Sequence, residues 1–300
     1  MNTQAQILLT QIDELPCLRI QHPKASALIA LQGAQVLEYT PAGAEPVIWL
    51  SETAAFKGGQ SVRGGIPVCW PWFGDLKRNP AEVQRSVQGD PALAHGWVRN
   101  QPWLLEHTSI DADAARIRLR YPTPLGLGSP WAAQVSLTLD ILVGAELNLQ
   151  LTTVNWSDAP ITYSQALHSY FAVSDIDKVQ VLDLEQCRYI DTLLQWRECA
   201  DADPLSIRQE TDRIYLDTPA TIRLLDLGWQ RIIHINSDTS RSAVVWNPWI
   251  DKSARLSHFA ADAWQRMLCI ETARVLDDCV TLPPGEQDTV RLNIGLSAPA

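Results

Sequence analysis

The sequence has few cations for its length. Its 300 residues include 24 Lys and Arg against 34 Asp and Glu, so the formal net charge at pH 7 is −10. A protein that binds nucleic acid needs a basic face to displace the counterions of the phosphate backbone. The shortage of cations argues against a nucleic-acid partner, and an anionic substrate would need a locally basic pocket.

Long apolar runs are also missing. No stretch approaches the roughly 20 apolar residues of a membrane-spanning helix. Residues 1–16 place no basic leader before an apolar core, as a signal peptide would. We therefore expect no membrane partner and a cytoplasmic location. The composition, 46% hydrophobic and 19% charged, is that of a globular protein.

No two of the six cysteines form a C-x-x-C pair. The cysteines are Cys17, Cys69, Cys187, Cys199, Cys269 and Cys279. Scattered cysteines in a chain of this size are most simply buried free thiols in a reducing cytosol. G-x-S-x-G, P-loop, H-E-x-x-H and Cys/His zinc spacings are absent as well. We expect neither a metal nor a cofactor.

The sequence is rich in period-two alternation. Apolar and polar side chains alternate over residues 116–121, 134–143, 146–154 and 290–296. This pattern is typical of half-buried strands, and Gly144-Ala145 fits a two-residue hairpin loop. Long helical periodicity is nearly absent, regular βαβ alternation is missing, and no linker marks a boundary. We predict an all-β fold, one large antiparallel β-sandwich with few short helices, as a single domain over residues 1–300.

Residues 75–94 interrupt the strand-like pattern. They contain few apolar residues and show no clear period, so we predict a loop. A segment with little apolar surface to bury gains nothing that offsets the entropy of ordering it. We therefore expect this loop to be mobile without ligand.

Cations gather on either side of this loop. Residues 57–99 contain six cations and three anions, a local excess of positive charge in an acidic chain. Arg63 precedes Gly64-Gly65, which allow the backbone to bend or to approach a ligand closely. Because the planar fork of arginine suits phosphate, the excess indicates an anion site with Arg63 and Arg99 as candidates. A simple surface charge would explain either arginine equally well.

Two residues are candidates for proton transfer. His168 lies in a run of apolar and small residues, and the charge of histidine changes near neutral pH. Glu271 follows an apolar run on an expected buried strand, where a carboxylate costs several kcal/mol unless it is paired or solvated. A buried structural pair explains both residues as well as a catalytic role does.

Six motifs occur in one order along the chain: RGGIPVCWPWFG, HGWVRN, ALHSYF, TDRIY, VVWNPW and CIETA. In this order they resemble the hexose-6-phosphate mutarotases (glucose-6-phosphate 1-epimerases) of the galactose-mutarotase-like superfamily, over roughly Leu28 to Leu296. The resemblance implies that family's large antiparallel β-sandwich. It also implies a metal-free isomerase that interconverts the α and β anomers of a hexose 6-phosphate, with glucose 6-phosphate the expected substrate. We expect a monomer.

The resemblance also implies the catalytic roles. His168 matches the family's catalytic histidine and Glu271 its catalytic glutamate. Ionised Glu271 would take the proton of the C1 hydroxyl while protonated His168 gives one to the ring oxygen. The open-chain aldehyde would then rotate and reclose from its other face. Because one group is ionised and the other protonated, a bell-shaped pH profile is expected.

The resemblance assigns the substrate-binding residues too. Arg63 and Arg99 match the family's phosphate- and substrate-binding arginines, and Asp212 and His95 match positions that face sugar hydroxyls. The length of the loop after RGGIPVCWPWFG and the arginine after CIETA, Arg274, depart from the family pattern, and both bear on sugar specificity.

Two alternatives remain open from the sequence. One is an aldose 1-epimerase that acts on free sugars, with its arginines merely on the surface. The other is a non-catalytic carbohydrate-binding sandwich that uses the flat faces of the 12 Trp residues. The relaxation of a pure α-anomer distinguishes them, because a binder leaves its rate unchanged.

Overall fold

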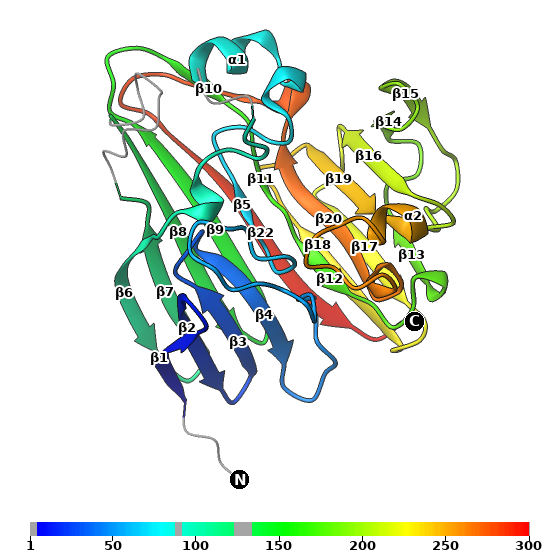
Figure 1. Cartoon of the computed structure of the whole chain (residues 1–300), viewed down its shortest axis with the longest axis horizontal. Coiled ribbons are helices and arrows are strands. Elements are labelled where there is room, and N and C mark those ends of the chain that lie inside the picture. Colours follow the sequence, from blue (N-terminus) through cyan, green and yellow to red (C-terminus); the bar gives the residue numbers. More distant parts are fainter. Residues whose placement is uncertain (1–4, 88–91, 123–133, 300) are drawn as a thin grey trace.

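The body of the protein consists of antiparallel sheets in two layers (Figure 1). A computed structural model describes residues 5–87, 92–122 and 134–299. The first sheet, the N-terminal sheet, has the strand order β1 (Gln6–Ile12), β2 (Leu15–His22), β3 (Ala25–Ala30) and β4 (Gln35–Pro41). In the described part of the chain, no helix is long and apolar enough to cross a membrane.

The second sheet contains the strands that the alternation predicts, and we call it the alternating sheet. Its order is β13 (Val179–Leu182), β17 (Thr221–Asp226), β18 (Arg231–Asn236), β22 (Gln287–Ser297), β9 (Leu147–Asn155), β8 (Val135–Gly144), β7 (Ala114–Arg120) and β6 (Leu104–Ile110). The four predicted strands, β22, β9, β8 and β7, are neighbours here. In β8, buried apolar residues alternate with half-buried ones, so the predicted antiparallel β-fold is confirmed.

The turn between β8 and β9 differs from the prediction. Val143 pairs with Leu147, so three residues, 144–146, form the turn instead of two. Gly144 is needed there for space: a Cβ atom at this position would lie 2.8 Å from the carbonyl oxygen of Asp113. The glycine therefore marks close packing against the neighbouring hairpin and not a special turn type.

The third sheet, which we call the site sheet, shows no alternation. Its order is β15 (Arg197–Ala200), β14 (Arg188–Asp191), β16 (Thr211–Leu216), β19 (Ser242–Asn247), β20 (Met267–Arg274), β11 (Gln165–Leu167) and β5 (Val68–Cys69), and β12 (Tyr170–Ala172) also pairs with β20. Seven of the eight residues of β20 are buried. The central strands β19 and β20 are covered on both faces, which removes the polar side chains that make a strand recognisable.

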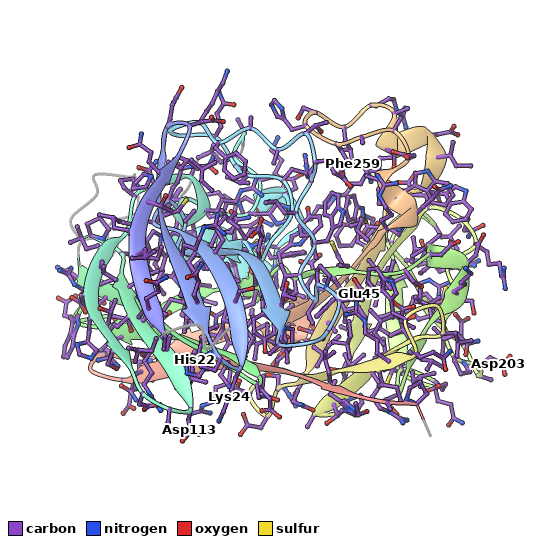
Figure 2. All side chains as sticks on the ribbon, turned by 90° about the horizontal axis from the view of Figure 1, so that it is seen from below. His22, Lys24, Glu45, Asp113, Asp203 and Phe259 are labelled. Carbon is purple, nitrogen blue, oxygen red and sulfur yellow. The ribbon has the colours of Figure 1, made fainter. Side chains whose placement is uncertain are left out.

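The two layers enclose a large common core. Ile29 of β3, Leu139 of β8 and Ile270 of β20 belong to one buried cluster. Seen from below in Figure 2, the N-terminal strands lie above the layer that contains the long strand β22. The layers are also joined at the tips of two hairpins, where Lys24 Nζ lies 2.7 Å from Asp113 Oδ1, both labelled in Figure 2.

The helices are few and short, as predicted. They are α1 (Ala81–Val87), α2 (Trp249–Ser253) and the 3-10 turns η1 (Leu76–Arg78), η2 (Val98–Asn100), η4 (Ile176–Lys178), η5 (Ala263–Gln265) and η6 (Leu276–Asp278). A small two-stranded sheet pairs β10 (Ile161–Tyr163) with β21 (Val280–Leu282), and α1 packs beside β10 (Figure 1).

Residues 76–78 and 81–87 form η1 and α1, so our prediction of a loop is wrong for them. Val83 and Val87, four residues apart on one face of α1, are buried in the core together with Leu76. These three side chains are apolar surface whose burial offsets part of the entropy of ordering the segment, which the prediction did not count. Seven helical residues make barely two turns, too few for the period to stand out. The rest of the expected mobile loop includes residues 88–91, which lie outside the described residues.

We expect α1 to protect this segment from proteolysis. Val83→Ala combined with Val87→Ala removes four buried methyl groups, which weakens docking of the helix by about 3 kcal/mol. Limited trypsin digestion should cut the basic sites within 77–85 faster in the double variant than in the wild type or in Glu82→Ala, an exposed change on the same helix. Equal cleavage of all three proteins would show that the helix is not stably docked.

Candidate active site

The two candidate proton-transfer residues face each other across neighbouring strands. β11 and β12 both pair with β20 in a single register, which puts His168, in the gap between them, opposite Glu271. In this gap the His168 backbone N–H donates to the Pro67 carbonyl at 3.0 Å instead of to β20. His168 Nε2 lies 3.4 Å from Glu271 Oε1. Sheet register thus brings together two residues that are about 100 positions apart in the sequence.

The same face of the site sheet extends the site sideways. Glu271 is opposite Val244 on β19, and Val244 is opposite Ile214 on β16. Two residues further along, on the same face, Asp212 of β16 is opposite Trp246 of β19. Asp212 is therefore placed two strands from the His168–Glu271 pair by the pleat alone.

These side chains line a cavity of about 480 Å³. That volume suits a small-molecule ligand. Five of the six predicted site residues line it: Arg63, His95, His168, Asp212 and Glu271. The sixth, Arg99, is not among its lining residues, although its charge acts on two of the histidines there, as shown below.

Several lining residues were missed by the sequence analysis. They are Phe73, Arg78, Tyr170, Trp196, Trp246 and Lys252. Phe73, Tyr170 and Trp246 belong to the quoted motifs, so the signal was present but pointed to no particular residue. Trp196 lies outside every motif, and only the fold brings it to the cavity.

Two glycines place Arg63 at the cavity. Gly64 and Gly65 have φ of +105° and +71°, values that favour glycine. A Cβ atom on Gly65 would lie 2.4 Å from the carbonyl oxygen of Val36, and one on Gly64 would lie 2.7 Å from that of Trp49. The two glycines therefore allow backbone segments to approach each other closely. The sequence alone had also allowed a close approach of the backbone to a ligand.

Aromatic rings surround His168. The ring of Tyr170 stacks on it with centroids 4.8 Å apart and planes 8° apart, and the ring of His95 lies 5.5 Å away. Phe73 closes the cage at 6.4 Å from His168 and 4.9 Å from His95. Burial raises the pKa of the Tyr170 hydroxyl, and the nearby guanidinium of Arg63 opposes that rise. The cage leaves His168 only 8% exposed.

His95 is held as a neutral hydrogen-bond donor. Its Nδ1 accepts the backbone N–H of Gly74 at 3.2 Å, and a backbone N–H cannot accept, so this nitrogen carries no proton. Burial and the positive charges of Arg99 and Arg63 hold the pKa of His95 well below its ordinary value. The remaining proton is on Nε2, so the ring can donate one hydrogen bond and is unsuited to act as a cationic acid.

Two buried atoms of the facing pair lack hydrogen-bond partners among the described residues. They are His168 Nδ1 and Glu271 Oε2. A buried polar atom without a partner costs about 1–3 kcal/mol, so native proteins retain few of them without a functional reason. Both residues line the cavity, so these buried atoms belong to side chains at its wall.

The surroundings favour the uncharged forms of both groups. Burial, together with the positive charges of Arg99 and Arg63, lowers the pKa of His168 from 6.5 to about 3. Burial also raises the pKa of Glu271 well above its ordinary value, as does the negative charge of Asp212. Perturbed acid–base pairs in a cleft are typical of catalytic sites.

Arg274, the departure from the family pattern, lies away from the cavity. Its Nη1 forms an ion pair with Asp288 Oδ1 at 2.6 Å, and Asp288 also accepts hydrogen bonds from Tyr163 and Gln165. This arginine therefore satisfies a partly buried polar cluster between the layers and does not contact the ligand cavity. Among the described residues, no three His, Cys, Asp or Glu side chains gather to hold a metal ion.

The architecture is that of the galactose-mutarotase-like proteins. The crystal structure of a "putative mutarotase (YeaD)" from Salmonella typhimurium superposes with a TM-score of 0.87 at 29% identity, covering 100% of this chain and 96% of that one. A galactose mutarotase-like protein from Clostridium acetobutylicum shares the fold with a TM-score of 0.70 at 14% identity, covering 99% and 100% of the two chains.

Sequence comparison narrows the class to one family. The aldose 1-epimerase family profile matches residues 16–295. A protein of Escherichia coli K12 described as a "putative glucose-6-phosphate 1-epimerase" is 35% identical over 264 residues, 88% of this chain and 84% of that protein. One of the same description from Cenchrus ciliaris is 31% identical over 91% of this chain and 81% of its own length. The chain belongs to the aldose 1-epimerase family.

The raised pKa of Glu271 predicts a pH-dependent cost in stability. The unfolded chain releases this proton near the ordinary value of about 4.3, whereas the folded protein retains it to higher pH. Stability is therefore lost as pH rises above about 4.3, by up to about 1.4 kcal/mol per pH unit until the folded pKa is reached. Glu271→Gln removes this loss.

We expect Glu271→Gln to melt at a higher temperature than the wild type at pH 7, by about 2–4 °C for each kcal/mol recovered. The difference should shrink towards pH 4. Scanning calorimetry from pH 4 to 8 measures it, with the exposed Glu82→Gln as a control whose carboxylate is not buried. A gain in melting temperature that is independent of pH would rule out ionisation of Glu271 as the cause.

Proposed function

We propose that this protein interconverts the α and β anomers of a hexose 6-phosphate, with glucose 6-phosphate as the first candidate. One observation carries the proposal: His168 and Glu271 face each other at a cavity with one buried, unpartnered polar atom each. The names of the E. coli and Cenchrus relatives support the choice of substrate. The cation of Arg63 in the same cavity supports an anionic one.

Anomer exchange requires one proton to leave the C1 hydroxyl and one to reach the ring oxygen. In this proposal His168 and Glu271 perform both transfers and hold one exchangeable proton between them. The lowered pKa of His168 and the raised pKa of Glu271 both favour this proton on Glu271 in the free cavity. Both groups are then neutral. Ionised Glu271 with protonated His168, the form that the sequence analysis starts from, is the charge-separated arrangement of the same proton.

The two arrangements correspond to the two halves of the reaction. Opening the ring from one arrangement takes a proton from O1 and gives a proton to the ring oxygen, which leaves the pair in the other arrangement. Rotation about C1–C2 presents the opposite face of the aldehyde. Reclosure reverses both transfers and restores the starting pair, so the protein needs no external acid or base.

A phosphorylated substrate would also assist the pair electrostatically. The positive charges of Arg99 and Arg63 oppose protonation of His168. A bound phosphate dianion offsets those charges and so favours the charge-separated form. His95 Nε2–H and the carboxylate of Asp212 are suited to bind sugar hydroxyls as donor and acceptor, respectively. We further propose that the protein acts as a monomer of one domain in the cytoplasm.

Exchange spectroscopy of the anomeric protons tests the function directly. Catalytic amounts of the protein should speed the exchange between the α and β resonances of glucose 6-phosphate, and should speed that of free glucose less. Equal acceleration of free and phosphorylated sugars would favour a general aldose 1-epimerase. An unchanged exchange rate for every sugar, with binding still detectable, would favour the non-catalytic sandwich.

Removing either proton carrier should abolish most activity without unfolding the protein. We expect Glu271→Gln and His168→Asn each to lower kcat by about 100- to 10,000-fold, the usual contribution of a general acid or base. Anomer-exchange rates on glucose 6-phosphate, with circular dichroism to verify folding, provide the measurement. Near-normal turnover in either folded variant would remove that residue from the mechanism.

The two arginines should differ in what they control. Arg63→Ala should raise KM for glucose 6-phosphate by about 10- to 150-fold, which is the change in affinity expected from losing one hydrogen bond to a charged group. The KM for free glucose should change much less, because free glucose has no phosphate to bind. Arg99→Ala removes a charge that lowers the pKa of His168, so the acid limb of kcat/KM should move to higher pH.

Lys57→Ala, an exposed cation in the same basic segment, is the matched control and should change neither property. Equal losses on free and phosphorylated glucose in Arg63→Ala would mean that this arginine contacts the sugar ring or is structural. An acid limb that does not move in Arg99→Ala would mean that its charge does not reach His168.

A further inference from the structure

Arg78 is a cation at the cavity that the sequence analysis did not single out. It lies at the end of η1 and lines the same cavity as His168 and Glu271. Among the described residues, no carboxylate forms an ion pair with it. Lys252, another cation of the cavity, is by contrast paired with Glu210 at 2.9 Å. The charge of Arg78 is therefore available to an anionic ligand.

The guanidinium of Arg78 is held in place by an indole ring. Its Cζ lies 5.2 Å from the centroid of the Trp196 ring, a cation–π distance. A cation–π contact uses the charge of the guanidinium and not its N–H groups, which remain able to donate to an oxyanion. Arg78 therefore retains the fork that recognises phosphate and has less side-chain freedom to lose on binding.

The backbone beneath both side chains is fixed as well. The Asn79 side-chain amide donates to the carbonyl oxygens of Phe73 and Asp75, and its Oδ1 accepts from the Ser164 hydroxyl. On the other side, Trp196 has φ of +61°, which is costly for a bulky residue and persists only where its surroundings enforce it. Strain of this kind at the edge of a ligand cavity points to a functional position.

The place of Trp196 in the sheet separates it from the chemistry. It follows β14, which is three strands from β20 in the site sheet, or about 14 Å at the usual strand spacing. A group that far from Glu271 cannot take part in proton transfer at C1. The Arg78–Trp196 pair is therefore suited to binding a remote part of the substrate.

We propose that Arg78, positioned by Trp196, is a phosphate ligand of the substrate and sets the preference of the cavity for phosphorylated over free hexose. This inference rests on the proposed function for its substrate. It adds a specificity residue from the segment after RGGIPVCWPWFG, where the sequence departs from the family pattern. Trp196 acts through Arg78 as a positioning residue.

Steady-state kinetics of Arg78→Ala on two substrates provide the first test. KM for glucose 6-phosphate should rise about 10-fold or more, with kcat changed less than about twofold, and the kinetics on free glucose should stay the same. The effect should diminish at high salt, because Arg78 is exposed. Lys77→Ala is the matched control, since Lys77 is an exposed cation on the same turn that does not line the cavity.

A double-mutant cycle tests the role of Trp196. Trp196→Leu should raise KM for glucose 6-phosphate in the wild type but have little further effect in Arg78→Ala, because it acts only through that arginine. Arg78→Lys should recover part of the loss, since lysine keeps the charge without the fork. Additive effects of the two single substitutions would overturn the positioning role.

Calorimetric titration with inorganic phosphate separates this inference from the proposed function. The wild type and Lys77→Ala should bind phosphate about 10-fold or more tightly than Arg78→Ala, whether or not any sugar is turned over. Loss of this difference in a protein that exchanges glucose 6-phosphate anomers would overturn the phosphate subsite and leave the function standing. The difference without any anomer exchange would overturn the function and leave the subsite.

Discussion

The site depends on one register between antiparallel strands. β11 and β12 pair with β20 as though they were a single strand interrupted at His168, and this register alone sets His168 opposite Glu271. A slip of one residue would turn every side chain of β20 to the other face, exchanging Glu271 for the core residue Ile270. The packing of the core therefore fixes the chemistry: Ile270 cannot stay buried between the layers unless Glu271 stays on the face of the cavity.

Holding that pair in place works against stability. A carboxyl and an imidazole are buried side by side, each with a polar atom that lacks a partner among the described residues. Their burial shifts both pKa values towards the neutral forms, which is the less costly way to keep them out of water. A large common core behind the sheet can offset such a local cost, whereas a small domain has little stability to spare.

The sequence reveals the alternating sheet far better than the site sheet. β7, β8, β9 and β22 have one solvated face, so polar residues at every second position reveal them. β20 is covered on both faces and reads as an apolar run from which only Glu271 stands out. The motifs indicate which segments matter, but cross-strand pairing is a long-range property. For that reason Tyr170 could not be assigned to the face of His168, nor Trp196 to the cavity, from local pattern.

Chemistry and recognition are built from different parts of the chain. The proton carriers His168 and Glu271 project from, or between, strands of the site sheet, whose positions are fixed by pairing on both sides. Arg63 and Arg78 come from the connections that cover this face, one from a glycine turn and the other from a short 3-10 turn anchored by Asn79. Connections accept changes in length and sequence that a central strand does not. Within such a division the acid–base pair can stay the same while the cations around it decide which sugar is bound.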